Sequence, residues 1–222
     1  RDLRMSRGLG DVYKRQIQKD TKERVSNIIV MGMGEPLDNY EELLRFIKLV
    51  SCEKGIGISQ RNITVSTCGL VDKIRMLADE KLQITLAISL HAPNDEIRRQ
   101  TMPIANRYTI GEIIQACKYY FDKTGRRITF EYSMIRGVND KEEHAKELAG
   151  RLSGLNCHIN LIPLNEVKER NCYRSTKEDI EKFKTILEKY RKTVTIRREM
   201  GSDIDAACGQ LRKKFLTKNG RN

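Results

Sequence analysis

The sequence predicts an α/β fold, a partial (β/α)6 barrel of parallel strands, with an open doubly wound sheet as the alternative. Two observations carry this prediction. Short runs rich in β-branched residues alternate along the chain with longer segments whose apolar residues recur at helical spacing. Strands that alternate with helices imply right-handed βαβ units, and therefore a parallel sheet. Six such strands are expected, with no internal repeat or low-complexity tract.

The first half of the chain opens on a strand over 27–31, an apolar run of the kind that is buried on both faces. Asn39 is expected to cap a helix over 40–50. The inner stripe of this helix is formed by Leu43, Leu44, Ile47 and Val50. A strand over 62–65, a helix over 71–78 and a strand over 84–88 follow in that order.

The second half carries three helix-start signals in which a capping residue precedes Glu by three positions. Thr109 with Glu112 opens a helix to about Asp122, which Gly125 ends. The other two pairs are Asp140 with Glu143, and Ser175 with Glu178. The first of these opens a helix that ends near Leu152, and the second opens a helix whose inner side carries Ile180, Phe183, Leu187 and Tyr190. Strands are expected over 128–134, 158–162 and 193–196, and an irregular loop over 165–173.

The 222 residues are enough for one domain with a real core. Residues 1–16 show neither helical nor strand period and resemble translated adapter DNA, so we interpret them as a non-native leader. A genuine flexible basic arm is the alternative. Residues 17–222 are then expected to form the single domain.

The chain is strongly basic, with 42 Lys and Arg against 30 Asp and Glu and a net charge of +12. Such an excess favours a polyanionic partner, although a basic protein without a nucleic-acid partner is the alternative. No run of eighteen apolar residues and no secretory signal occurs, so no membrane association is expected and the predicted location is the cytoplasm.

The six cysteines form no CxxC pair and the three histidines no HxxxH pair, so the sequence predicts no metal site. Most of the cysteines are expected to be small buried hydrophobes. Cys208 is different, because two alanines and a glycine flank it and leave its sulfur accessible. Arg197 and Arg198 would favour its thiolate, which makes Cys208 a candidate nucleophile.

Functional groups of parallel α/β folds gather where the strands end. The strands are followed in turn by Gly34-Glu35, the Ser66 segment, Ser89-Leu90-His91 and Asn165. Turn formation alone would explain the glycines and asparagines, but not the glutamate, the serines or the histidine. We therefore expect a pocket at this rim, where Glu35 accepts a hydrogen bond from a cationic amine.

A set of long motifs occurs over about residues 26–211, namely MGMGEPLDNY, STCG, SLHAPND, R-x-T-MPIA, YTI, EYSMIRGVND, HINLIPLN and RRxxGSDIDAACGQL. This set resembles the radical S-adenosylmethionine methyltransferases that modify carbon 2 of an adenine in 23S ribosomal RNA. Relatives that methylate carbon 8 of the same adenine share much of the pattern and are the nearest alternative.

The resemblance implies a radical-enzyme (β/α)6 barrel over residues 17–222, with S-adenosylmethionine and a [4Fe–4S] cluster as cofactors. It assigns S-adenosylmethionine binding to Gly34, Glu35, Ser66, Ser89, Leu90, His91 and Asn165. It also implies that Cys208 first takes a methyl group, which then loses a hydrogen atom and adds to the adenine ring. A second cysteine would resolve the adduct as a disulfide. The implied partners are 23S ribosomal RNA, with transfer RNA as a second substrate, and an electron donor such as flavodoxin.

The chain departs from this family because it has no CxxxCxxC motif. The family's resolving cysteine, its acidic proton acceptor and its RNA-contacting amino-terminal domain also have no counterparts in these 222 residues. We therefore expect the first strand and the cluster loop of the family to be missing, the amino terminus to be truncated, and the fragment to be inactive alone. The alternative from another class is a cluster-less domain that binds RNA or nucleotides.

Overall fold

A computed structural model describes residues 16, 18–31, 34–53, 57–164 and 172–198. Within them, six parallel strands form one sheet in the order β1 to β6, which confirms the predicted α/β class. The strands are β1 Ile28–Val30, β2 Ile63–Thr67, β3 Thr85–Ser89, β4 Ile128–Met134, β5 Cys157–Pro163 and β6 Thr193–Ile196. Each joins its sequence neighbour only, as in a barrel rather than a doubly wound sheet.

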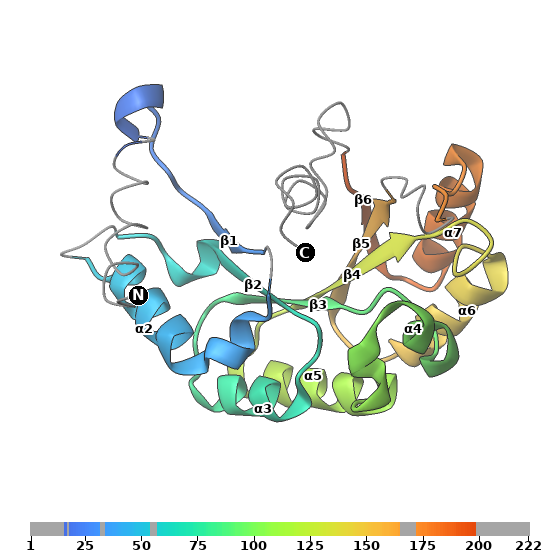
Figure 1. The fold of residues 1–222 in the computed structure, drawn as a ribbon, viewed down its shortest axis with the longest axis horizontal. Helices are drawn as coiled ribbons and strands as arrows, with labels where there is room; N and C mark the ends of the chain where they lie inside the picture. The colour runs from blue at the N-terminus through green and yellow to red at the C-terminus, as the bar shows by residue number, and fades with distance from the viewer. Residues whose placement is uncertain (1–15, 17, 32–33, 54–56, 165–171, 199–222) are drawn as a thin grey trace, which may run out of the picture.

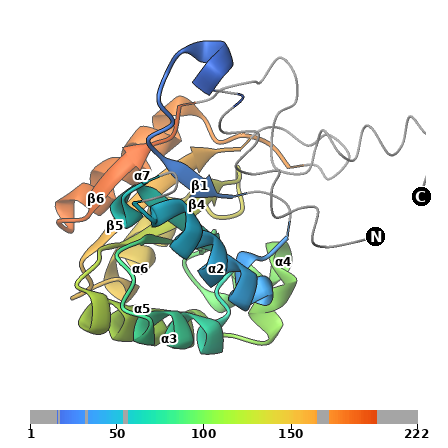
Figure 2. The ribbon, with the colours of Figure 1, turned by 90° about the vertical axis from the view of Figure 1, so that its left-hand side faces the viewer.

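Six helices of the described residues lie along the outer side of the curved sheet, and none of these six covers its inner side (Figures 1 and 2). They are α2 Tyr40–Ser51, α3 Val71–Asp79, α4 Asp95–Thr101, α5 Ile110–Thr124, α6 Glu142–Arg151 and α7 Lys177–Lys189. Short 3-10 helices cover Pro36–Asn39 (η2), Gln60–Asn62 (η3) and Pro103–Asn106 (η4). None of the helices in this part of the chain is both long and apolar enough to span a membrane.

The hydrophobic core lies between the sheet and the helices. In β4, Ile128, Phe130, Tyr132 and Met134 are buried against them. Thr129 and Ser133 alternate with these residues and face the inner side, where they are half-buried. The inner face of the sheet is therefore the polar one.

Several predicted helix signals are confirmed. Thr109 and Glu112 form the expected capping box of α5, and Gly125 ends this helix with a φ of +65°. Asn39 directly precedes α2 as predicted, although its side chain makes no capping hydrogen bond.

Other signals were wrong by one residue, and each for a physical reason. The caps are Lys141 for α6 and Thr176 for α7, rather than Asp140 and Ser175. Asp140 instead accepts the Ser175 hydroxyl at 2.7 Å, so these two side chains join the loops that precede the two helices.

Two expectations about single elements also failed. Tyr190 lies beyond the end of α7 and is 53% exposed, so it is not on the inner stripe. The sequence also gave no expectation of α4, which Asn94 caps by accepting a hydrogen bond from the Ile97 N–H at 3.0 Å.

Candidate functional site

Glu35 joins the carboxyl ends of β1 and β2. Its Oε1 accepts a hydrogen bond from the Leu37 N–H at 3.0 Å, and its Oε2 accepts one from the Cys68 N–H at 2.7 Å. Gly34, directly before it, has a φ of +98°, a conformation that favours glycine. Each carboxylate oxygen has a further lone pair, so Glu35 is held in one orientation and can still accept a donor from a ligand.

The side chain of Arg98 on α4 links the carboxyl ends of β2 and β3 by hydrogen bonds. Its side chain is fully buried, and Nη2 donates to the Cys68 carbonyl at 2.7 Å while Nε donates to the Leu90 carbonyl at 3.2 Å. Longer contacts, both of 3.4 Å, reach the carbonyls of Ser89 and Tyr108. A guanidinium holds its five N–H groups in one plane, so these contacts fix the two strand ends relative to each other.

Asn139 and His91 join the ends of β3 and β4. Asn139 is fully buried, and its amide nitrogen donates to the carbonyls of His91 and Ser133, both at 2.8 Å. Its Oδ1 accepts the Ile135 N–H at 2.7 Å. The ring Nδ1 of His91 accepts the Ser133 N–H at 3.0 Å, so a neutral His91 carries its proton on Nε2.

A chain of hydrogen bonds crosses the inner face from β4 to β6. The amide of Asn160 donates to Glu131 Oε2 at 2.9 Å, and the Thr195 hydroxyl donates to Asn160 Oδ1 at 3.1 Å. The Thr195 oxygen must then accept from His158 Nε2, which lies 2.8 Å away. His158 Nδ1 is left as a buried acceptor, and it has no hydrogen-bond partner in the described part of the chain.

The environment shifts the pKa of three groups around this face. Burial, with a contribution from the charge of Arg98, lowers the pKa of His91 to about 4, so its ring is neutral at pH 7. Burial raises the pKa of Glu131, and the amide of Asn160 and the charge of Arg197 oppose this rise. Burial and the neighbouring Glu35 raise the pKa of Cys68 to about 12, so this thiol is not ionised at pH 7.

The structure brings most of the predicted site residues to one edge of the sheet. Ser66 and Ser89 are half-buried, and both belong to the polar inner face. Leu90 differs, because its side chain is fully buried in the core and its carbonyl and N–H are bonded to Arg98 and Glu131. Asn165 and Cys208 lie outside the described residues.

Sequence reasoning missed Glu131, which pairs in register with Ser89 and is 5% exposed. It also missed Asn160, Thr195 and the role of Arg98. The sequence does carry a signal for Glu131, since polar and apolar residues alternate strictly through 128–134. Glu131 lies within a strand, whereas the expected site residues were those at or after the strand ends.

The cysteines of the described residues lie far apart in the sequence and differ in exposure. Cys117 and Cys157 are buried as expected, but Cys68 and Cys172 are half-buried and Cys52 is exposed. Across the described ranges, no three His, Cys, Asp or Glu side chains come together as metal ligands. These residues therefore do not fit an iron–sulfur cluster.

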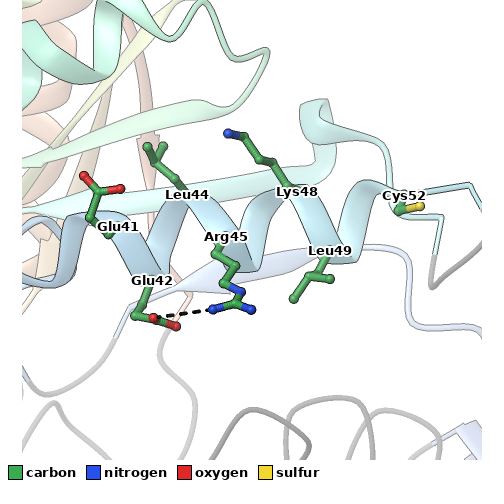
Figure 3. A pocket seen from close by; sticks show the side chains of 7 residues that line it. All are labelled: Glu41, Glu42, Leu44, Arg45, Lys48, Leu49 and Cys52. Atoms are coloured by element: carbon green, nitrogen blue, oxygen red, sulfur yellow. Dashed lines mark ion pairs between the residues drawn. The ribbon is translucent and has the colours of Figure 1, made fainter. Parts of the chain in front are cut away.

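A shallow hollow lies along the outer surface of α2, away from this edge (Figure 3). Glu41, Glu42, Leu44, Arg45, Lys48, Leu49 and Cys52 line it. Its side chains include acidic and basic groups, and Glu42 and Arg45 form an ion pair at 4.0 Å. None of the polar groups at the carboxyl edge of the sheet lines it, so we do not assign the chemistry to it.

Residues 10–149 match the family model described as the radical SAM superfamily. Together with the parallel sheet and the polar groups at its carboxyl edge, this match shows that the chain belongs to that superfamily. Within it, the chain is a relative of proteins named "Probable dual-specificity RNA methyltransferase RlmN". It is 61% identical to the one from Lachnospira eligens over 97% of this chain, and 58% identical to the one from Clostridium tetani over 96%.

The chain spans about three fifths of these relatives, covering 61% of the first and 60% of the second. A solved structure of a radical SAM methyltransferase from Sphaerobacter thermophilus is 47% identical, with a TM-score of 0.84 over 89% of this chain and 57% of that one. A domain of a pyruvate-formate lyase-activating enzyme from Bacteroides vulgatus shares the fold alone, at 21% identity and a TM-score of 0.59 over 78% of this chain and all of that domain.

Proposed function

We propose that this chain provides the S-adenosylmethionine-binding barrel of an RNA methyltransferase that methylates carbon 2 of an adenine in 23S ribosomal RNA. An adenine in the anticodon loop of transfer RNA is proposed as a second substrate. The observation that carries the proposal is the set of polar groups at the carboxyl edge, centred on Glu35, in a radical SAM chain whose relatives are named as RNA methyltransferases.

The residues of this edge suit S-adenosylmethionine in charge and in polarity. The Glu35 carboxylate would accept a hydrogen bond from the cationic amino group of the ligand. Two backbone N–H groups already hold this carboxylate in place. The neighbouring hydroxyls of Ser66 and Ser89 would provide donors and acceptors for its other polar groups. S-adenosylmethionine, when bound, supplies the methyl group.

The inner face would then receive the rest of the ligand. Glu131 and Asn160 lie beside Ser89 in register across β3, β4 and β5, and their hydrogen bonds to each other keep both side chains in fixed positions. Fixed polar groups reduce the cost of ordering the site when a ligand binds. We propose that Asn165 completes the binding site and that Cys208 is the methyl-accepting nucleophile.

We also propose that the reaction takes place in the cytoplasm and depends on a [4Fe–4S] cluster and an electron donor such as flavodoxin. The described residues do not fit the cluster, and the sequence has no CxxxCxxC spacing. The proposal therefore assigns no cluster ligand to this chain, and its residues are given roles in binding and orientation alone.

The test is the position of the methyl group that the native gene product adds to RNA. Digestion of treated 23S ribosomal RNA and mass spectrometry with synthetic standards distinguish 2-methyladenine from 8-methyladenine. The proposal expects the carbon-2 product, and expects Cys208→Ala to abolish it. A carbon-8 product, or methylation that survives in the Cys208→Ala variant, would contradict it.

A further inference from the structure

An exposed tyrosine and four arginines lie at the carboxyl edge of β4, β5 and β6. Tyr173 is 51% exposed, although it is one of the large hydrophobic side chains. Three segments at this edge contribute basic residues, namely the loop after β4, the segment before α7 and the residues that follow β6. We call this set the basic–aromatic rim, and it consists of Arg136, Tyr173, Arg174, Arg197 and Arg198.

Backbone contacts hold these segments together. The Arg136 N–H donates to the Tyr173 carbonyl at 2.9 Å, and Ile135 and Arg174 form an antiparallel bridge. The Arg197 N–H donates to the Leu161 carbonyl at 2.8 Å, so this residue continues the pairing of β6 with β5. The loop after β4 and the chain entering α7 accordingly run side by side (Figure 1). The basic–aromatic rim is thus built on paired backbone.

Two acidic residues of the described chain near Arg136 have partners. Asp140 accepts from the Ser175 hydroxyl and from the Gly137 N–H, and Glu143 pairs with Lys141 at 3.7 Å. Arg136, Arg197 and Arg198 are exposed. Among the described residues, the exposed side chains of this rim are therefore mainly basic, in keeping with the overall charge of +12.

An exposed aromatic ring among guanidinium groups is suited to single-stranded RNA. Unpaired bases stack on aromatic side chains, and arginines pair with phosphates or stack on bases. We propose that the basic–aromatic rim binds an unpaired segment of the substrate RNA beside the target adenine. The inference rests on the proposed function, because the rim lies at the same end of the strands as Glu35, Ser66 and Ser89.

The opposite end of the strands offers a matched control. Tyr190 is 53% exposed and is followed by Arg191, which is exposed as well. This pair follows α7 and precedes β6, so it lies at the amino-terminal end of the sheet. Each place therefore offers one exposed tyrosine and one exposed arginine for substitution, at opposite ends of the strands.

The test is the fluorescence anisotropy of a dye-labelled, single-stranded, adenine-containing RNA titrated with the 222-residue chain at several salt concentrations. Tyr173→Ala should weaken binding by about 5- to 150-fold, the range for loss of one stacked base. Arg136→Gln should reduce the slope of log affinity against log salt by about 0.7, the value for one phosphate contact on a single strand.

Tyr190→Ala and Arg191→Gln should leave both quantities unchanged, and circular dichroism should show the same melting temperature for all four variants. Equal effects at the two ends, or no effect of Tyr173→Ala, would overturn this inference and leave the proposed function standing, provided that the wild-type chain binds RNA. If the wild-type chain binds no RNA, both fail.

Discussion

Replacement of the buried Arg98 should destabilise the protein far more than replacement of its neighbour in sequence. Arg98 is fully buried and donates to four backbone carbonyls, at 2.7, 3.2, 3.4 and 3.4 Å. A hydrogen bond from a charged donor contributes about 1.5–3 kcal/mol, so the two shorter ones together contribute about 3–6 kcal/mol. Arg98→Met also removes the cost of burying a charge, so we expect a net loss of about 3–5 kcal/mol, as for other broken buried networks.

In a protein of this size, such a loss corresponds to a decrease of about 6–20 °C in melting temperature. Urea unfolding followed by far-UV circular dichroism measures the free energy directly. Arg99→Met is the matched control, because Arg99 lies on the same helix and is exposed, and it should change stability by less than about 0.5 kcal/mol. The free energy of unfolding of Arg98→Lys should lie between those of the two Met variants, since one ammonium group cannot reach both strand ends. If Arg98→Met and Arg99→Met unfold at the same urea concentration, the assigned role of Arg98 is wrong.

Two further predictions concern the same edge. The native state keeps His91 neutral down to about pH 4, whereas the unfolded chain protonates it near pH 6.5. Wild-type stability should therefore fall, relative to His91→Asn, by up to about 3 kcal/mol as the pH is lowered from 6.5 to 4, and parallel pH profiles of the two proteins would refute this. Gly69→Ala should cost about 2–4 kcal/mol, because its φ is +101° and a Cβ would lie 2.8 Å from Ile113 Cδ1. Gly137 has a φ of +72°, but an added Cβ would meet open space, so Gly137→Ala should lower the stability by only about 1 kcal/mol. An equal loss of stability in the two variants would refute the contribution of the contact with Ile113.

The strands and most of the helices could be predicted because their signals are local. Alternation of apolar runs located all six strands to within about two residues. The cap at Thr109 was predicted because both members of its capping box stand in sequence order. The predicted caps at Asp140 and Ser175 were wrong, because these two side chains bond to each other across 35 residues, a contact that no local pattern reveals.

The residues of the candidate site also fall into two groups, those that local patterns predict and those that they do not. Glu35, Ser66, Ser89 and His91 were found because they stand at the ends of predicted strands. The side chains that hold those ends together come from elsewhere in the chain. Arg98 lies on a helix that was not predicted, and Asn139 stood out only as part of the EYSMIRGVND motif. Their roles depend on contacts with the backbone of distant residues, which only the folded chain defines.

The most direct test of the central claim is calorimetric titration of the 222-residue chain with S-adenosylmethionine. We predict that the wild-type chain binds it and that Glu35→Gln weakens binding by about 10- to 150-fold, the equivalent of one charge-assisted hydrogen bond of about 1.5–3 kcal/mol. Glu41→Gln, which changes an exposed carboxylate on the outer side of α2, should bind as the wild type does (Figure 3). Absence of binding to the wild-type chain, or an unchanged dissociation constant for Glu35→Gln, would contradict the account.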